Sequence, residues 1–297
     1  MLRWTSTHSS AGCLTTPFRC QARTQRDSAK SPNATTSSCR SVSPKRVRSA
    51  WERFGTPTFF STATVQLLNR HRKLVPTWAE KLTWANGDAA YLRPEETDIG
   101  RVGALICGEN TNTLARFALL AQGEQVHIAT YPPAWPFHRP GGGAQAYNLT
   151  EAIRIRSAAH AFEGKVFNVV SSCTFDAYAI EQLSQGDSEM KELLQAAPAP
   201  VSIIVGPNGE LLADPVVGGE GMVVAEIDIA RSIEHKMAHD IVGYYNRFDI
   251  FHLEVDPTPN RPVWIKKSRW GDEQLFGEAT QLAQGVFPNS GDGPLQV

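Results

Sequence analysis

Short apolar runs separated by polar and glycine-containing segments dominate the chain from about residue 59 onward. Runs of this length predict buried strands, which we place at 64–74, 101–107, 125–132, 166–172, 201–205 and 222–229. The stretch VSIIVGPNGELLADP at 201–215 contains a Pro-Asn-Gly turn between two strand-like runs, and this chemistry predicts a hairpin.

Helical spacing of apolar residues alternates with these strands. Leu, Phe and Leu recur at helical spacing from Thr113 to Leu120, and Gly123 is expected to end that helix. A second helix is predicted to begin at a Thr150 cap, run through EAIRIRSAAHAFEG and end at Gly164, and a short one covers 230–239. The Pro/Gly-rich segment 131–143 predicts a loop. Alternating strands and helices indicate a mixed α/β fold in which helices cover a central sheet.

Composition changes sharply near residue 55. Residues 1–54 are rich in Ser, Thr and basic residues with no hydrophobic period, so we expect a low-complexity segment without a core of its own. Residues 55–256 carry the α/β pattern, and 257–297 form an irregular tail. The first segment has the composition of an organellar transit peptide, but lacks a developed apolar face, so we favour a cytoplasmic protein. A misjoined or frameshifted N-terminus is the favoured alternative.

Charge and hydropathy exclude several partner classes. The formal net charge of −1 and the lack of basic segments interleaved with aromatic residues argue against a nucleic-acid partner. No apolar stretch approaches the roughly 18 residues that a membrane span needs, and no secretory signal is present. The five cysteines form no zinc-type or disulfide spacing, which indicates a reducing compartment.

Cys107 is the residue whose position suggests chemistry. It ends the apolar run GALIC and precedes turn residues and a helix, where a side chain is exposed at the rim of a sheet beside backbone N–H groups. A buried structural thiol is the alternative that local context alone leaves open. A basic cluster, RHRKLVPT at 70–77, is interrupted by residues that prefer burial, unlike a solvated surface run.

Four blocks in order resemble the nitrilases of the carbon-nitrogen hydrolase superfamily from about residue 55 to 256. They are HRKLVPTWAEKLTWANGD at 71–88, GRVGALICGENTNTLARFALLAQGEQVHIATYP at 100–132, TEAIRIRSAAHAFEGKVFNVVSSC at 150–173 and HDIVGYYNRFDIF at 239–251. The resemblance implies an α-β-β-α sandwich, here incomplete at its N-terminus, and a homo-oligomer. It also implies a Cys107 nucleophile, the family lysine at Lys73 and a supporting glutamate at Glu80.

These residue types suit nitrile hydrolysis without a metal or organic cofactor. A thiol needs help to attack a nitrile carbon, and a lysine ammonium favours the thiolate while a carboxylate moves protons. The expected reaction converts an organic nitrile to a carboxylic acid and ammonia through a thioimidate and a thioester. A related amidase or cyanide hydratase, or a catalytically inactive nitrilase-like protein, is the alternative.

Departures from the family pattern motivate the inactive alternative. The family's first glutamate lies on an early strand before the lysine, and it has no counterpart in this sequence. Glu52 does precede the lysine, but it lies in a segment that resembles a later part of the fold. Gly108 stands where the family usually has tryptophan, just before Glu109.

Four other residues have competing interpretations. His127 lies in a buried strand and is expected to be a hydrogen-bonded core histidine. Cys173 is expected to be either a structural thiol or part of the pocket wall. Trp135 and Phe137 are expected either to pack or to shape the pocket or a subunit contact.

Overall fold

The part of the chain that carries described elements lies within one compact unit. The computed structural model describes residues 2–7, 18–22, 57–61, 67–136 and 147–260, with side chains from residue 67 onward. The chain divides into two units, Met1–Pro259 and Asn260–Val297, and all elements below belong to the first.

A six-stranded sheet forms the centre of this unit, with the strand order β10-β9-β8-β7-β6-β5. β6, β7 and β8 run parallel, while β5, β9 and β10 pair antiparallel with their neighbours. The bounds are β5 Glu95–Thr97, β6 Gly100–Ile106, β7 Val126–Tyr131, β8 Phe167–Ser172, β9 Val201–Val205 and β10 Val216–Val217. The parallel strands need long crossover connections, and two helices provide them.

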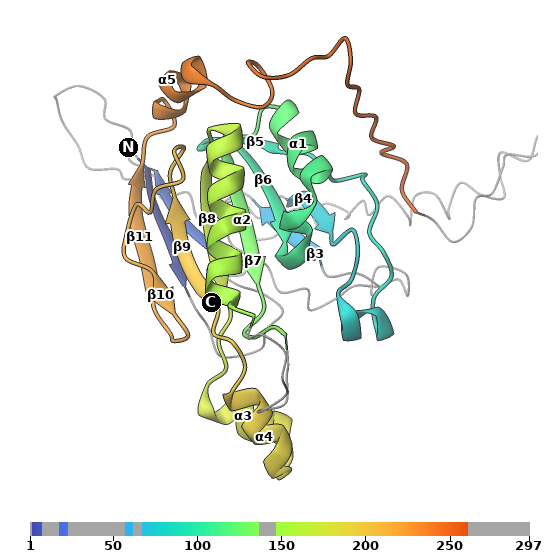
Figure 1. Cartoon of the computed structure of the whole chain (residues 1–297), viewed down its shortest axis with the longest axis vertical. Helices are drawn as coiled ribbons and strands as arrows, with labels where there is room; N and C mark the ends of the chain where they lie inside the picture. Colours follow the sequence, from blue (N-terminus) through green and yellow to red (C-terminus); the bar gives the residue numbers. More distant parts are fainter. Residues whose placement is uncertain (1, 8–17, 23–56, 62–66, 137–146, 261–297) are drawn as a thin grey trace, which may run out of the picture. The chain divides into compact units, whose positions relative to one another are not determined.

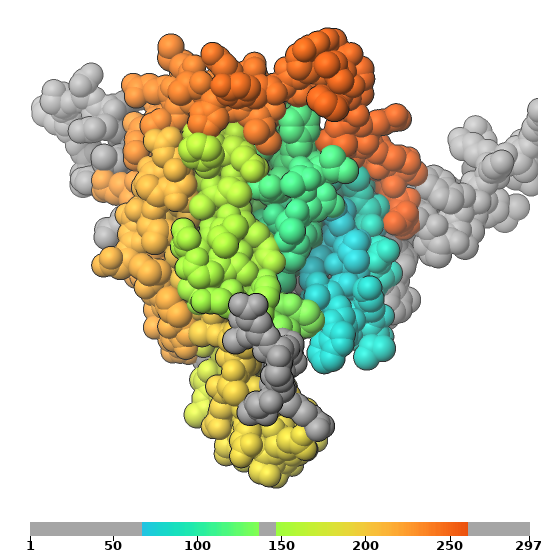
Figure 2. Space-filling model, in the orientation of Figure 1, coloured from blue at the N-terminus to red at the C-terminus, as the bar shows by residue number. Residues whose placement is uncertain are grey.

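Helices α1 (Thr113–Ala121) and α2 (Leu149–Gly164) connect β6 to β7 and β7 to β8, and both cover the same face of the sheet (Figures 1 and 2). Leu105 of β6 packs there against Leu119 of α1, and Ala129 of β7 against Ile153 of α2. Because strand side chains alternate between faces, the odd-numbered residues of β6 and β7 point toward the helices. Cys107 and His127 share this parity.

The opposite face of the sheet packs on a second sheet of order β11-β1-β2, with β1 at Leu2–Thr7, β2 at Phe18–Ala22 and β11 at Met222–Ile227. Val223, Ala225 and Ile227 of β11 are buried in one core with Val102 of β6 and Ile128 of β7. The layers of helices, sheet and second sheet are three of the four that the sequence predicted. β1 and β2 lie inside segment 1–54, where no strand was expected.

A two-stranded sheet, β3 (Pro57–Ser61) with β4 (Leu67–Arg72), precedes the main sheet. The short 3-10 helices η2 (Trp78–Leu82) and η3 (Cys107–Thr111) follow β4 and β6. Helices α3 (Ala177–Ser184) and α4 (Ser188–Gln195) form an unpredicted pair, and α5 (Arg231–Ala238) matches the short helix expected at 230–239. Among the described residues, no helix has the length and apolar character needed to cross a membrane.

One of the predicted ends of the second helix is wrong and the other is confirmed. Asn148, rather than Thr150, caps α2: its side chain accepts from the N–H of Glu151, while the Thr150 hydroxyl donates to the Ala199 carbonyl. Gly164 does end α2, but a different feature makes it necessary. A Cβ there would lie 2.1 Å from a methyl carbon of Leu120, so the glycine permits close packing of α2 on α1.

The hairpin at 201–215 is also only partly as predicted. Gly209 has the positive φ of 81° expected at the turn, but the returning residues 210–215 form no strand. Leu211 makes a single bridge to Val205, and regular pairing resumes at β10. The Glu210 carbonyl and Leu212 N–H still bond back to β9 and its turn, so the arm is irregular but attached.

Candidate active site

Cys107 occupies a sharp turn at the end of β6. Its φ of 55° lies in the left-handed region, which is uncommon for any residue other than glycine. The side-chain amide of Asn110 donates to the carbonyls of Leu105 and Cys107, at 3.1 and 3.0 Å, and so holds the turn. The sequence prediction that a strand hands over to a helical turn at this cysteine is confirmed.

β4 directs alternate side chains toward the interior: Asn69, His71 and Lys73, which directly follows the strand, are each no more than 2% exposed. A buried ammonium is costly unless it is paired. Lys73 Nζ donates to Glu80 Oε2 at 2.6 Å and to Thr77 Oγ1 at 2.9 Å. Lys73 and Glu80, two of the three predicted site residues, therefore form an ion pair.

Glu80 is fixed by the start of η2. The N–H of Thr77 donates to Glu80 Oε2 at 2.5 Å, while the Thr77 side chain completes a capping box with the helix. The segment that follows folds back over β4, because the N–H of Gly87 donates to the Lys73 and Leu74 carbonyls. A Cβ at Gly87 would lie 2.4 Å from the Arg72 carbonyl oxygen, so this approach requires glycine.

Charges from this pair act on the third predicted residue. Burial raises the pKa of the Cys107 thiol, Lys73 and Arg156 oppose that increase, and Glu80 adds to it. The sequence correctly anticipated that Lys73 would favour the thiolate, but the net shift is upward because burial is the larger effect. At neutral pH Cys107 is therefore a thiol.

Glu109 joins the cysteine turn to β4. Its Oε1 lies 2.6 Å from Nε2 of His71, and both side chains are buried. His71 was not singled out in the sequence, although it lies two residues before Lys73 and so shares its strand face. This contact fixes the relative positions of the strand that leads to Lys73 and the turn that carries Cys107.

Residues from α2 and β7 complete the surroundings of Cys107. Arg156 donates to Thr111 Oγ1 at 2.7 Å and to the Tyr147 hydroxyl at 2.8 Å. Burial raises the pKa of the Tyr131 phenol above its usual range, and both Arg156 and Cys107 also influence it. These contacts join residues far apart in the sequence, and no local motif signalled them.

A pocket of about 410 Å³ opens beside the turn, a volume in the range of small-molecule sites. Thr77 and Gly108 lie on its wall, so it reaches both the Lys73 segment and the Cys107 turn. A Cβ at Gly108 would have Thr77 Oγ1 as its nearest neighbour, 4.0 Å away, so the glycine leaves space there. The complete lining is Leu74, Val75, Pro76, Thr77, Trp78, Lys81, Gly108, Glu109 and Asn112.

The residues with competing interpretations fall in different places. Cys173 is buried at the end of β8 and does not line this pocket, which favours the structural interpretation. Trp135 packs against the core under α2, with its ring centroid 5.9 Å from that of the pocket residue Trp78. Phe137 and Glu52 lie outside the described residues.

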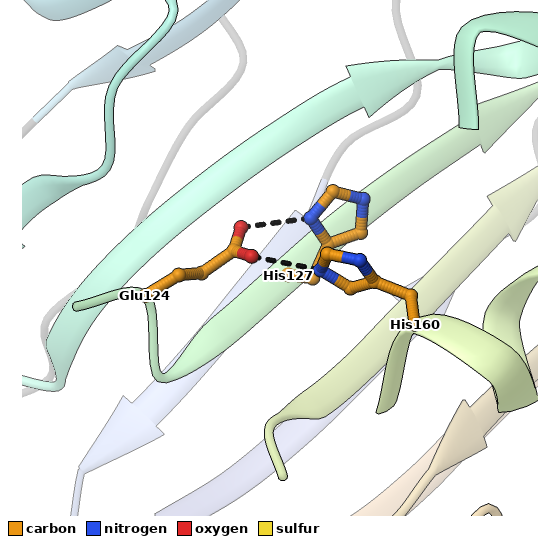
Figure 3. Close-up of side chains that lie close together, drawn as sticks. All are labelled: Glu124, His127 and His160. Atoms are coloured by element: carbon orange, nitrogen blue, oxygen red, sulfur yellow. Dashed lines mark hydrogen bonds and ion pairs between the residues drawn. The ribbon is translucent and has the colours of Figure 1, made fainter. Parts of the chain in front are cut away.

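His127 is a hydrogen-bonded core histidine, as predicted, and it belongs to a buried cluster (Figure 3). Glu124, in the turn before β7, places one carboxylate oxygen 2.8 Å from His127 Nδ1 and the other 2.7 Å from Nε2 of His160 on α2. All three side chains are at most 1% exposed. Their potential ligand atoms lie within 4.8 Å of one another, so this trio meets the spatial minimum for a metal site.

The pKa shifts within this cluster determine which of its side chains are charged. Burial would raise the pKa of Glu124, but His127 and His160 outweigh it and lower the value to about 2. Burial and the charge of His127 lower the pKa of His160 to about 4. At neutral pH Glu124 is therefore a carboxylate and His160 a neutral imidazole.

Known proteins share both the sequence pattern and the fold. A protein named nitrilase from Paraburkholderia phymatum is 35% identical over 210 residues, covering 71% of this chain and 58% of that protein. Nitrilase 3 of Arabidopsis thaliana is 31% identical over 209 residues, covering 70% of this chain and 57% of that protein. The chain thus spans less than two thirds of the length of these relatives.

Among solved structures, a carbon-nitrogen hydrolase from Helicobacter pylori aligns with a TM-score of 0.52 at 17% identity, covering 62% of this chain and 60% of that one. This similarity supports the predicted α-β-β-α architecture. Residues 58–237 match the carbon-nitrogen hydrolase family, and this region contains Lys73, Glu80 and Cys107. The chain belongs to the carbon-nitrogen hydrolase family.

Proposed function

We propose that this chain is a nitrilase-type thiol hydrolase that converts an organic nitrile and water to a carboxylic acid and ammonia. The observation that carries the proposal is the ion pair between buried Lys73 and partly exposed Glu80, whose charges both act on Cys107 beside a pocket. The names of the relatives support the same reaction class. The apolar lining from Leu74, Val75 and Trp78 favours a nitrile with an apolar substituent.

In the proposed first stage, Cys107 attacks the nitrile carbon while its thiol proton passes to Glu80. The hydrogen bonds of Glu80 with described residues go to Oε2, so we assign the proton to Oε1. The new S–C bond forms as one C–N π bond breaks, and the proton moves to the substrate nitrogen to give a thioimidate. The Lys73 ammonium stabilises the negative charge that develops on this nitrogen.

In the second stage, Glu80 takes a proton from a water molecule that adds to the thioimidate carbon. That proton passes to nitrogen and gives a tetrahedral intermediate with one hydroxyl and one amino group. Glu80 then transfers the hydroxyl proton to the amino group as the C=O bond forms, so the C–N bond breaks, ammonia leaves and a thioester remains. A second water, activated in the same way, attacks the thioester carbonyl. The C–S bond then breaks, the carboxylic acid departs and the Cys107 thiol is restored.

Ammonia release from a panel of aliphatic and aromatic nitriles tests this function. The wild type should release ammonia and acid, and Cys107→Ala should abolish turnover. Cys173→Ala is the matched control, because it removes the other cysteine with a described side chain and should retain activity. Amide as the main product would identify a hydratase-like enzyme, and turnover of amides alone would identify an amidase.

A catalytically silent protein is the second candidate. It is favoured by the upward pKa shift of Cys107 and by the missing counterpart of the family's first glutamate, whose task Glu80 would have to perform alone. Absence of turnover, together with equally slow labelling of Cys107 and Cys173 by iodoacetamide, would support this candidate. Faster labelling of Cys107 would support an activated nucleophile.

Further predictions concern the assembled protein. We propose a homo-oligomer in the cytoplasm, with no metal or organic cofactor and with sequence segments at 1–54, 55–256 and 257–297, of which the first also supplies β1 and β2 to the second sheet. Size-exclusion chromatography with light scattering tests the assembly.

Translation of the upstream DNA in the other frames tests the proposed misjoined N-terminus, which would be wrong if no frame encodes a strand bearing a Pro-Glu pair.

A further inference from the structure

The side-chain amide of Asn110 has a fixed orientation. Its nitrogen lies 3.1 Å from the Leu105 carbonyl and 3.0 Å from the Cys107 carbonyl, and both are pure acceptors. Only the NH₂ end of the amide can satisfy two acceptors. The amide oxygen of Asn110 must therefore be the end that faces His127, at 2.9 Å from its Nε2.

This orientation determines the protons on His127. Because the Asn110 oxygen can only accept, Nε2 of His127 carries a proton. On the other side of the ring, Nδ1 lies 2.8 Å from Glu124 Oε1, and an ionised carboxylate can also only accept. His127 therefore links the Glu124 carboxylate to the Asn110 amide oxygen through its two ring nitrogens.

The surroundings of Glu124 fit a carboxylate held in one position. Gly103 of β6 leaves the space for it, since a Cβ there would lie 2.0 Å from Glu124 Oε1. His160 of α2 approaches Oε2 as a neutral donor, and its Nδ1 has no hydrogen-bond partner in the described part of the chain. Arg116 of α1, which pairs with Glu163, is the next charged group and acts on His160.

Protons explain this cluster better than a metal ion does. Each carboxylate oxygen is at hydrogen-bond distance from a different imidazole, and Nε2 of His127 is engaged by an amide oxygen. A zinc ion would instead bond directly to unprotonated imidazole nitrogens at about 2.0 Å. Binding such an ion would require both nitrogens of the Glu124 contacts to exchange their protons for metal.

We propose that Glu124, His127 and Asn110 form a buried hydrogen-bond chain that positions Cys107 for attack. This hydrogen-bond chain ends on two backbone carbonyls. One belongs to Leu105, two residues before the turn, and the other to Cys107, which has the left-handed φ. Its charged inner end strengthens each hydrogen bond toward the turn. The inference rests on the proposed role of Cys107 as nucleophile, and the three residues act through that turn as positioning residues.

Two substitutions at one position separate the links of this chain. Asparagine can place its amide nitrogen near the former Nδ1, so His127→Asn retains a donor to Glu124 but loses the link to Asn110. Glutamine reaches the former Nε2 position, so His127→Gln retains a donor to Asn110. His160→Gln is the matched control, because it changes the other imidazole on the same carboxylate without touching Asn110.

The readouts are kcat and KM for the nitrile that the wild type turns over best, and the rate at which iodoacetamide labels Cys107. Misplacing a reacting atom by about 1 Å can cost about 100-fold in rate, so His127→Asn should lower kcat by about 10- to 100-fold with KM nearly unchanged. Labelling of Cys107 should slow in the same variant. His127→Gln should recover most of both losses, and His160→Gln should stay within about threefold of the wild type.

Equal kcat and labelling rates in folded His127→Asn and wild type would overturn the inference while leaving the proposed function intact. Loss of both properties to the same extent in His160→Gln would also overturn it, since the effect would then be general destabilisation. If the wild type hydrolyses no nitrile, the proposed function fails, and the labelling rates alone still decide whether the chain positions Cys107.

A measurement on the wild type covers the case in which the variants do not fold. Nitrogen NMR of histidine-labelled protein at neutral pH should show a proton on Nε2 of His127, with the signal assigned to His127 by spatial contacts. A His127 whose Nε2 carries no proton would overturn the inference. Stoichiometric zinc in the purified protein, found by mass spectrometry and lost in His160→Gln, would do the same.

Discussion

The pH dependence of folding should carry the signature of His160. The pKa of its imidazole is about 4 in the folded chain, against an ordinary value of 6.5. Between these values the unfolded chain binds a proton that the folded chain does not, so the free energy of unfolding rises with pH through this window. The stabilisation is complete above pH 6.5 and lost as the pH falls to about 4.

The size of this effect follows from the shift. A difference of about 2.5 pH units, at about 1.4 kcal/mol for each unit, gives about 3 kcal/mol that is lost between pH 6.5 and pH 4. Glu124 adds a separate window at lower pH. Its pKa falls from 4.5 to about 2, so the stability it contributes is present above pH 4.5 and is lost as the pH approaches 2.

Urea denaturation followed by circular dichroism, at pH values from 7.5 down to 4.5, measures the His160 effect. His160→Gln keeps an amide donor that can reach Glu124 but does not titrate. The difference in unfolding free energy between wild type and His160→Gln should therefore shrink steadily as the pH falls. His252→Gln, at an exposed position, is the control and should leave the slope unchanged.

Parallel curves for the wild type and His160→Gln would refute this reasoning, because the buried imidazole would then titrate alike in both states. A difference that grows as the pH falls would also contradict it. Such a result would mean that protonated His160 stabilises the fold through Glu124.

Three more predictions follow from single contacts. Gly103→Ala should destabilise the protein by about 1 to 3 kcal/mol, because the new Cβ would meet Glu124 at 2.0 Å, and an unchanged melting temperature would contradict this. Asn148→Ala should cost about 1 kcal/mol in chemical denaturation through loss of the α2 cap on the Glu151 N–H, and a cost near zero would argue against the cap. Labelling of Cys107 by iodoacetamide should rise with pH to a midpoint above 9.0, since burial raises its pKa, and a midpoint near neutrality would show that the nearby cations prevail.

Sequence patterns predicted the elements that are buried on one or both faces. The runs that became β6, β7 and β8 are apolar because both sheet faces are covered, and they were placed within one or two residues. The helices α3 and α4, by contrast, were not predicted. Each spans only eight residues and buries a single one, Ser184 or Leu194, so the pattern in each is short.

The site was predictable where its residues lie in short motifs. Lys73 and Glu80 are seven positions apart, and one turn of chain brings them into contact. Glu124 and His160 are 36 positions apart and meet only because α2 packs on β7, which no pattern in one sequence reveals. The net pKa shift of Cys107 escaped prediction too, since burial is a property of the folded chain.

The space beside Gly108 has a consequence for how this protein can change. A Cβ added there would have the Thr77 hydroxyl oxygen as its nearest neighbour, at 4.0 Å, so the pocket wall has room at this position. Substitutions of Gly108, from alanine up to tryptophan, would therefore reduce the pocket volume by different amounts. A larger residue at position 108 would fill part of the pocket, so this single substitution should change the size of molecule that the pocket admits.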